Sequence, residues 1–208
     1  VKKAWPLQGY EGIEGMGYIP VISEIKDVDD DGTLDIFRLR SEKPGARIER
    51  LRYEDGSVVW ESEPLGAMWG DESRLPVFDL HGNGRYSVIF SCAHEDYGKI
   101  WCIDAETGET EWSVRYGEGI TWKGGDGHGE IVVGHFLDKE TQGVVVRDRG
   151  ILRCYNHKGE EMWTHDTKLR GKEEAYGALM MRCDVDGDGF DEIFPNWQKL
   201  TMGIRGDG

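Results

Sequence analysis

Two acidic loops place oxygen ligands at alternate positions around a glycine, and each runs directly into a strand-like segment. Ca²⁺ takes about six to eight oxygen ligands in a flexible cage, and glycine permits the sharp bend of such a loop. The expected ligands are Asp27, Asp29, Asp31, the carbonyl of Thr33 and Asp35 in the first loop, and Asp184, Asp186, Asp188, the carbonyl of Phe190 and Glu192 in the second. The pattern predicts one Ca²⁺ in each loop, with Asp191 pointing outwards.

Two other interpretations of these loops stay open. An EF-hand places similar ligands between two amphipathic helices and ends on a glutamate at its twelfth position. Here the following segments, Ile36 to Arg40 and Ile193 to Phe194, have the apolar pattern of strands. The other alternative is an ordinary solvated Asp/Gly turn that holds no metal.

A repeated unit positions these loops. Aligned on itself, the chain of 208 residues contains the unit four times, with an acidic loop after the first strand and a tryptophan in the last. Trp60, Trp112 and Trp163 lie 52 and 51 residues apart. Units of four short strands at a period of about 40 to 50 residues are typical of a β-propeller, whose blades pack around a channel. We predict an all-β single domain with blades at 18–64, 73–116, 119–166 and 176–208, the last completed by residues 1–8.

The fourth unit stops before its last strand, and the N-terminus supplies a matching one. Gly206 to Gly208 followed by Val1 to Trp5 reproduces the turn and tryptophan strand of the first unit. Such closure would remove exposed sheet edges, which promote aggregation, and predicts a ring of about four blades. The alternatives are part of a larger propeller, or two chains that close a larger ring as a dimer.

The other two acidic loops are weaker metal candidates. In the loop at 79–87, His81 stands where an oxygen ligand is expected. The loop at 122–130 retains only Asp126 and Glu130. We expect little or no Ca²⁺ in either.

The composition limits the partners. A formal charge of −15, from 40 acidic and 25 basic residues, disfavours nucleic acid, and no apolar run is long enough to span a membrane. A polyanionic ligand would need a local basic patch, for which residues 147–153 and 168–172 are the candidates. The four cysteines lack metal-ligand spacing; Cys92 and Cys102 could pair across a hairpin, or be buried free thiols.

The acidic loops resemble those of the FG-GAP and VCBS-type calcium-loop propellers. Residues 101–112 also resemble the repeat of quinoprotein propellers, which packs blades and does not by itself imply a quinone cofactor. A narrower resemblance covers 144–194, where Val144 to Arg149 leads to a tryptophan strand, then to Tyr176 to Leu179 and the second acidic loop. This part is similar to the rhamnogalacturonan lyases of polysaccharide lyase family 11. That resemblance implies a calcium-dependent propeller acting on an acidic polysaccharide, although those enzymes have eight blades.

Strand alternation places the acidic loops at one end of the blades and predicts a functional face at the other. Exposed aromatic rings bind flat sugar faces, and we expect this of Tyr18, Trp69 and Trp197. A uronate lyase needs a base, an acid and a positive group that neutralises the carboxylate. The candidates are His94, Tyr97, His135 and Tyr176 as base or acid, with Arg170 and Lys172 as neutralising groups.

We therefore predict an extracellular or periplasmic, Ca²⁺-stabilised β-propeller that handles carbohydrate. The leading enzymatic hypothesis is cleavage of an acidic polysaccharide by β-elimination. The alternatives are a non-catalytic carbohydrate-binding or adhesion module and a structural fragment of a larger enzyme. The chain has neither an initiator methionine nor a signal peptide, which is typical of a mature or trimmed chain.

Overall fold

The computed structural model of the chain describes residues 21–40, 45–65, 75–93, 97–118, 130–148, 150–168, 180–197, 200–201 and 203–205. These residues form strands and loops without a helix, which confirms the predicted all-β fold. The described part of the chain accordingly contains no helix able to cross a membrane.

The strands form four antiparallel sheets, each built from one continuous stretch of the chain in sequence order. The first sheet contains β1 (Val21–Lys26), β2 (Asp35–Arg40), β3 (Arg47–Arg52) and β4 (Val58–Glu61). The second contains β5 (Val77–Phe78), β6 (Ser87–Ala93), β7 (Tyr97–Asp104) and β8 (Thr110–Glu118). The third contains β9 (Ile131–Gly134), β10 (Gly143–Asp148), β11 (Ile151–Tyr155) and β12 (Glu161–Asp166). The fourth contains β13 (Met180–Cys183), β14 (Glu192–Trp197) and β15 (Leu200–Thr201).

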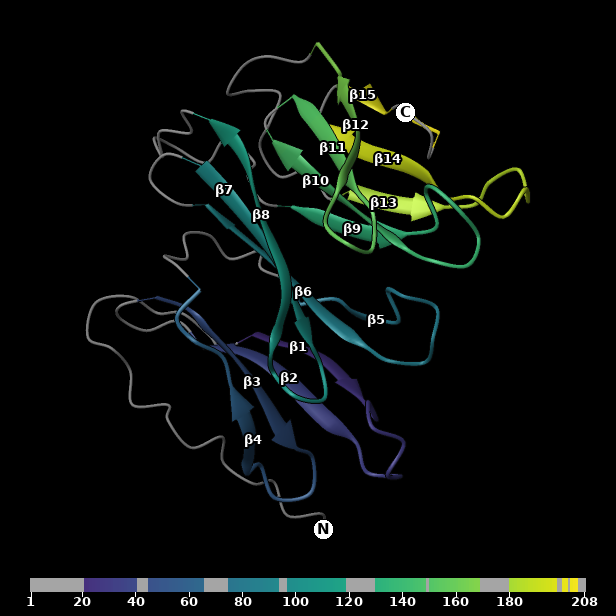
Figure 1. Cartoon of the computed structure of the whole chain (residues 1–208). Helices are drawn as coiled ribbons and strands as arrows, with labels where there is room; N and C mark the ends of the chain where they lie inside the picture. Colours follow the sequence, from purple (N-terminus) through teal and green to yellow (C-terminus); the bar gives the residue numbers. More distant parts are fainter. Residues whose placement is uncertain are drawn as a thin grey trace.

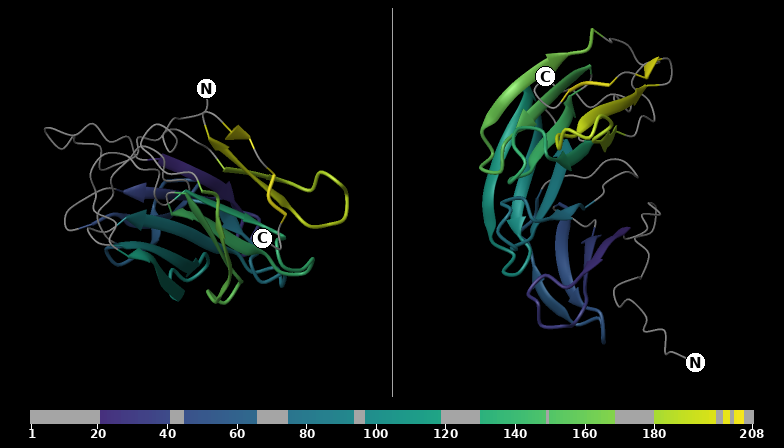
Figure 2. Two further views of the ribbon diagram at one scale, coloured as in Figure 1. Left: turned by 90° about the horizontal axis from the view of Figure 1, so that it is seen from above. Right: turned by 90° about the vertical axis from the view of Figure 1, so that its right-hand side faces the viewer.

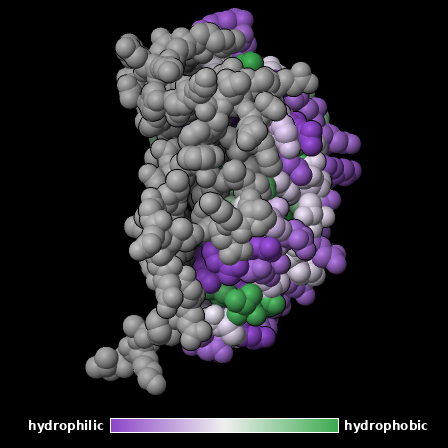
Figure 3. All heavy atoms as spheres, turned by 90° about the vertical axis from the view of Figure 1, so that its left-hand side faces the viewer, coloured by the Kyte–Doolittle hydropathy of each residue, from purple (hydrophilic) through white to green (hydrophobic). Residues whose placement is uncertain are grey.

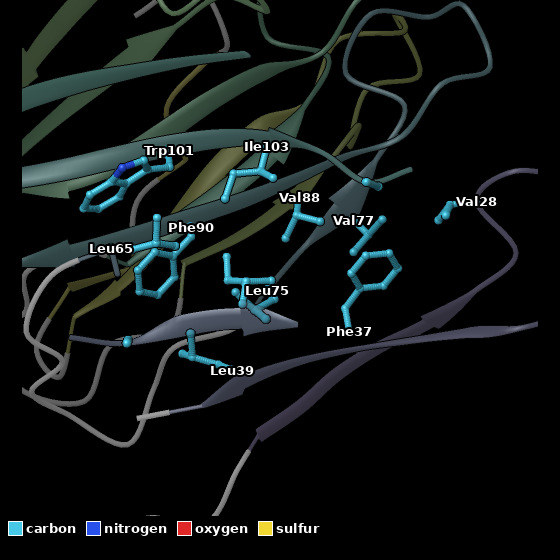
Figure 4. Close-up of a cluster of buried hydrophobic side chains, with 13 residues drawn as sticks. Val28, Phe37, Leu39, Leu65, Leu75, Val77, Val88, Phe90, Trp101 and Ile103 are labelled. Atoms are coloured by element: carbon cyan, nitrogen blue, oxygen red, sulfur yellow. The ribbon is translucent and has the colours of Figure 1, made fainter. Parts of the chain in front are cut away.

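Apolar clusters hold successive sheets face to face. In the first cluster, Phe37 and Leu39 from β2 pack with Val88 and Phe90 from β6 (Figure 4). Two further clusters join the second sheet to the third and the third to the fourth. The sheets follow one another in a row, with the first and fourth at opposite ends (Figures 1 and 2).

The second and third sheets are covered on both faces. Strand β10 shows the apolar sequence that such a position favours. All six of its residues are buried. Val144 and Val146 pack towards the second sheet, whereas Val145 packs towards the fourth. A continuous apolar run is expected where both faces of a strand are covered. Arg147 on the same strand is only 1% exposed and pairs with Glu130 at 3.3 Å, so it does not contribute to a basic surface patch.

A tryptophan on the last strand of one sheet docks on the last turn of the next. The indole Nε1 of Trp60 donates to the carbonyl of Ala105 at 3.0 Å. Its ring covers Gly108, where an added Cβ would lie 2.7 Å from the ring. Trp112 repeats the arrangement on the third sheet, with its indole on the next turn and its ring over Gly159. Trp60 and Trp112 therefore connect neighbouring sheets.

The closing strand expected from residues 1–8 lies outside the described residues, as does the turn at 206–208. Among the described residues, the fourth sheet has three strands. The face of the fourth sheet that points away from the third sheet carries Met181, which is 59% exposed.

Exposed large hydrophobic side chains concentrate on the first sheet and its loops. They include Ile25, Leu34, Tyr53, Val58 and Val59. On the face shown in Figure 3, the described residues are largely hydrophilic, with an apolar patch at the level of this sheet.

Cys102, Cys154 and Cys183 are free thiols, and only the last is exposed. Cys102 lies opposite Ile89 in the sheet, so the hairpin disulfide is not formed. Burial raises the pKa of Cys154 to about 12 and also raises that of Cys102. Because the thiolate is the reactive form, we expect an alkylating reagent to modify Cys183 in the folded protein and the two buried thiols only after denaturation. Peptide mapping by mass spectrometry checks this, and rapid native labelling of Cys102 would contradict it.

Candidate metal centres

A loop of eight residues joins the first two strands of every sheet. The loops are 27–34, 79–86, 135–142 and 184–191. In the third sheet, this corrects the sequence assignment of 122–130, because the loop after β9 begins at His135. The loop at 135–142 lacks the three alternating aspartates of the first and fourth loops, whereas the stretch before β9 contains Asp126 and Glu130.

The first loop gathers the three aspartates that the sequence predicted. Asp27, Asp29 and Asp31 each bring a carboxylate oxygen to within 4.8 Å of the others. Backbone donors shape the loop: Gly32 N donates to Asp27 Oδ2 at 2.9 Å, and Thr33 N donates to Asp31 Oδ1 at 2.7 Å. Asp27 Oδ1 is buried without a hydrogen-bond partner. A buried carboxylate oxygen without a donor is unfavourable, and a cation among these aspartates would satisfy it.

Asp35, the predicted last ligand of this loop, begins β2, is 3% exposed and does not belong to the group of three converging carboxylates. Its Oδ2 accepts a hydrogen bond from Arg50 at 2.8 Å, and the same guanidinium contacts Asp29 Oδ2 at 2.6 Å. Arg50 holds the pKa of the Asp29 carboxyl below its usual value, so this carboxyl is ionised at neutral pH. Sequence reasoning missed Arg50, because only the pairing of β2 with β3 brings it beside the loop.

The second predicted site has a similar arrangement in the loop of the fourth sheet. Asp184, Asp186 and Asp188 again place carboxylate oxygens within 4.8 Å of one another. Gly187 N and Gly189 N donate to the two oxygens of Asp184 at 2.7 and 2.9 Å. Both loops lie between paired strands, so the EF-hand alternative, which requires flanking helices, is wrong.

Asp191 does not point outwards as the sequence suggested. It is 5% exposed, and its Oδ2 accepts hydrogen bonds from His135 N and from the Arg182 guanidinium, both at 2.8 Å. The carboxylate thus ties the fourth sheet to the loop of the third. Its neighbour Glu192, a predicted ligand, accepts a hydrogen bond from Val185 N at 2.9 Å.

The third loop contains a side-chain cation of its own. Lys139 occupies the position that corresponds to Asp31 and Asp188, and its ammonium contacts the carbonyl oxygen of Asp188 in the next loop. The Lys139 ammonium also lies 5.1 Å from the centre of the Phe190 ring. The third loop is therefore linked to the second acidic cluster through a lysine.

The second loop keeps the backbone geometry of a metal loop with different side chains. Asp79 accepts hydrogen bonds from the backbone of Asn83 and Gly84. His81 replaces the middle aspartate, and its Nε2 lies 2.9 Å from Glu111 Oε2. Within the described residues, carboxylate clusters with metal-ligand spacing occur at 27–31 and 184–188.

The His81 ring also meets the ring of His157, with centroids 5.5 Å apart. Burial, and then the charge of His81, lower the pKa of His157, against an opposing effect of Asp138 and Glu160. A depressed histidine pKa means that the unfolded chain binds the proton more readily, so stability is full above the unfolded pKa of 6.5 and falls as the pH drops below it. We expect His157→Asn to reduce this acid-side loss, as measured by urea unfolding between neutral and mildly acidic pH. An unchanged pH dependence would contradict the assignment.

The predicted catalytic and sugar-binding residues are only partly described. His94, Arg170, Lys172, Tyr176, Tyr18 and Trp69 lie outside the described residues, and Trp197 is described only as the last residue of β14. Tyr97 begins β7, at the end of the sheet opposite the acidic loops, with the Arg115 guanidinium 4.2 Å from its ring centre.

His135 is not at the predicted functional face. It opens the third loop, and its Nδ1 lies 3.1 Å from the carbonyl oxygen of Thr141. It therefore belongs to the same end of the sheets as the acidic clusters, whereas Tyr97 lies at the other end. The sequence placed the third loop before β9, at 122–130, and therefore assigned His135 to the opposite end of the sheet.

Comparisons with known proteins show a shared fold. No protein-family model matches the sequence, and a search of curated proteins gave no match. The chain is similar to the exotype rhamnogalacturonan lyase YesX, with a TM-score of 0.65 and 19% identity over 91% of this chain and 40% of that one. Rhamnogalacturonan lyase YesW gives a TM-score of 0.64 and 18% identity over 91% and 41%.

The V. cholerae biofilm matrix protein Bap1 gives a TM-score of 0.53 and 18% identity over 91% of this chain and 29% of that one. At these identities the likeness concerns the fold alone. The chain spans less than half the length of each of these three structures.

Proposed function

We propose that this chain is a calcium-stabilised set of consecutive blades in a β-propeller that handles carbohydrate. The observation that carries the proposal is the pair of loops in which three carboxylates converge within 4.8 Å, on a fold shared with two rhamnogalacturonan lyases. Oxygen donors in a glycine-containing loop fit Ca²⁺. The ion would crosslink its loop and have a structural role.

The row of sheets supports membership of a larger propeller over a closed ring of four blades. In such folds each sheet packs on its neighbours around a channel. Here the first and fourth sheets lie at opposite ends of the row (Figure 1), and the exposed Met181 on the far face of the fourth sheet is suited to cover by another blade. Further blades, or a second copy of the chain, would complete the ring.

Acidic polysaccharide is the proposed ligand class, encountered outside the cytoplasm. In β-elimination a base removes the proton next to the uronate carboxylate, the bond to the leaving oxygen breaks as a double bond forms, and an acid protonates that oxygen. Tyr97 stands at the end of the sheets where such a site was predicted. The likeness to the matrix protein Bap1 favours the second candidate, a binding module without catalysis.

One assay separates these candidates. The folded protein is incubated with rhamnogalacturonan and other acidic polysaccharides, in Ca²⁺ or in chelator, while the ultraviolet absorbance of unsaturated uronate ends is followed. A rise that is abolished in Tyr97→Phe but retained in the surface variant Arg52→Met supports a lyase that uses Tyr97. Retention of the protein on immobilised polysaccharide without a rise supports the binding module. If the protein shows no rise in absorbance and is not retained on any polysaccharide, the carbohydrate proposal is overturned.

A further inference from the structure

Arg50 connects the first acidic loop to the neighbouring sheet. Its side chain is buried, with 5% relative exposure, and one nitrogen, Nη2, contacts Asp29 and Asp35. Its other terminal nitrogen, Nη1, donates to the carbonyl oxygen of Glu106 at 3.0 Å. Glu106 belongs to the turn between β7 and β8, on which Trp60 also docks through Ala105. One guanidinium therefore joins the acidic loop of the first sheet to the docking turn of the second.

The corresponding positions in the other sheets lack this link. Arg50 lies opposite Phe37, and the same register places Cys102 in the second sheet and Cys154 in the third. In the fourth sheet the position is held by Gly203, one residue before the bridge between Ile193 and Ile204. In the second predicted metal loop, Asp188 is contacted at 3.2 Å by Arg205, whose side chain is exposed and lies at a different position. This loop therefore lacks a buried arginine equivalent to Arg50 and provides an internal reference.

We infer that Arg50 couples cation binding by the loop at 27–35 to the docking of the first sheet on the second. The inference rests on the proposed Ca²⁺ site and adds a regulatory consequence to it. Arg50 is a positioning residue here, since it acts on the cation through the carboxylate of Asp29.

The geometry allows Arg50 and a cation to share the carboxylate of Asp29, which belongs to the converging cluster. Arg50 contacts Oδ2 of Asp29, so Oδ1 of the same carboxylate remains for the ion, while Asp35 holds the guanidinium from the strand side. A cation that fixes the Asp29 carboxylate also fixes the guanidinium bound to it. Because the arginine fork is planar and rigid, its other nitrogen is then held against Glu106. Ca²⁺ in the loop should therefore steady the turn at 104–108 in the next sheet.

Hydrogen exchange followed by mass spectrometry tests this coupling. Exchange is measured in Ca²⁺ and in chelator for the wild type, Arg50→Met and Arg50→Lys, with the exposed neighbour Arg52→Met as the matched control. The reporter amides are those of the loop at 27–35 and the turn at 104–108, where Ala105 N donates to Tyr86 O and Gly108 N to Asp104 O. The loop at 184–192 serves as the reference for Ca²⁺ binding elsewhere in the chain.

In the wild type and in Arg52→Met, we expect Ca²⁺ to slow exchange at both the loop and the turn, by at least about 5-fold, the lower end of typical coupling between sites. In Arg50→Met, the loop should still respond while the turn should not. Arg50→Lys keeps the charge without the fork and is expected to behave in the same way, which preserves the test if the methionine variant does not fold.

Two results would overturn the inference. One is a turn that still responds to Ca²⁺ in the Arg50 variants. The other is a wild-type loop that responds while its turn does not. If the wild-type loop itself shows no response to Ca²⁺, the proposed cation site at 27–35 fails, and the coupling fails with it.

Discussion

Calcium at a hundredfold excess over its dissociation constant is expected to stabilise the folded chain by about 2.7 kcal/mol for each loop that binds it. Both loops bring three carboxylates together, and like charges at such distances repel until a cation neutralises them. Urea unfolding followed by tryptophan fluorescence, in CaCl₂ and in chelator, measures the difference. With both loops occupied, the total should approach about 5.4 kcal/mol.

Variants at the first loop position provide the control for this experiment. Asp27→Asn together with Asp184→Asn should remove most of the calcium dependence, because an amide is a weaker ligand than a carboxylate. Asp79→Asn is the matched change, since Asp79 accepts the same kind of backbone hydrogen bonds in a loop without an acidic cluster. It should leave the calcium dependence intact. A calcium effect of equal size in all three proteins would mean that the ion binds elsewhere.

Gly108→Ala is expected to destabilise the protein by disturbing the contact of Trp60, from the first sheet, with the turn at Gly108 in the second. Gly108 has a φ of +78°, and an added Cβ would lie 2.7 Å from the Trp60 ring. The backbone strain amounts to about 1–3 kcal/mol, and overpacking against the ring adds about 1–3 kcal/mol. Urea unfolding measures the sum as a lower free energy of unfolding.

Gly84→Ala separates these two contributions. Gly84 has a φ of +87°, but no atom lies within 4 Å of the position of its Cβ. It should therefore show only the backbone strain and lose about 1–3 kcal/mol less than Gly108→Ala. Equal losses in the two variants would indicate that Trp60 moves aside freely and that the docking contact adds little to stability.

The sequence predicted the features that repeat locally. Alternate aspartates around Gly32 and Gly189 were enough to place two acidic clusters, because such a loop depends on residues close in the chain. The tryptophans marked the last strands of three units, and their positions match β4, β8 and β12. Local spacing carries this information because strands and tight loops are set by neighbouring residues.

What sequence reasoning missed depends on contacts between strands and between sheets. Arg50 reaches Asp35 only because β2 and β3 pair in one register. Arg147 reads as a surface charge, yet it lies on a strand covered on both sides. The loop after β9 has no metal-loop pattern in its sequence, because Lys139 stands where the first and fourth loops have an aspartate. In each case, tertiary packing determines the role of a charged residue, and residue type alone does not indicate that role.

The sheet topology also bears on how the chain acquires its structure. Every strand in the described sheets pairs only with strands next to it in the sequence. Pairing therefore requires the closure of short loops, whose entropic cost grows slowly with length, and low contact order favours fast folding. Repeat proteins built in this way have stabilities that are approximately sums of unit and nearest-neighbour terms. The order of the strands allows this β protein to form hairpin by hairpin, without first bringing distant segments together.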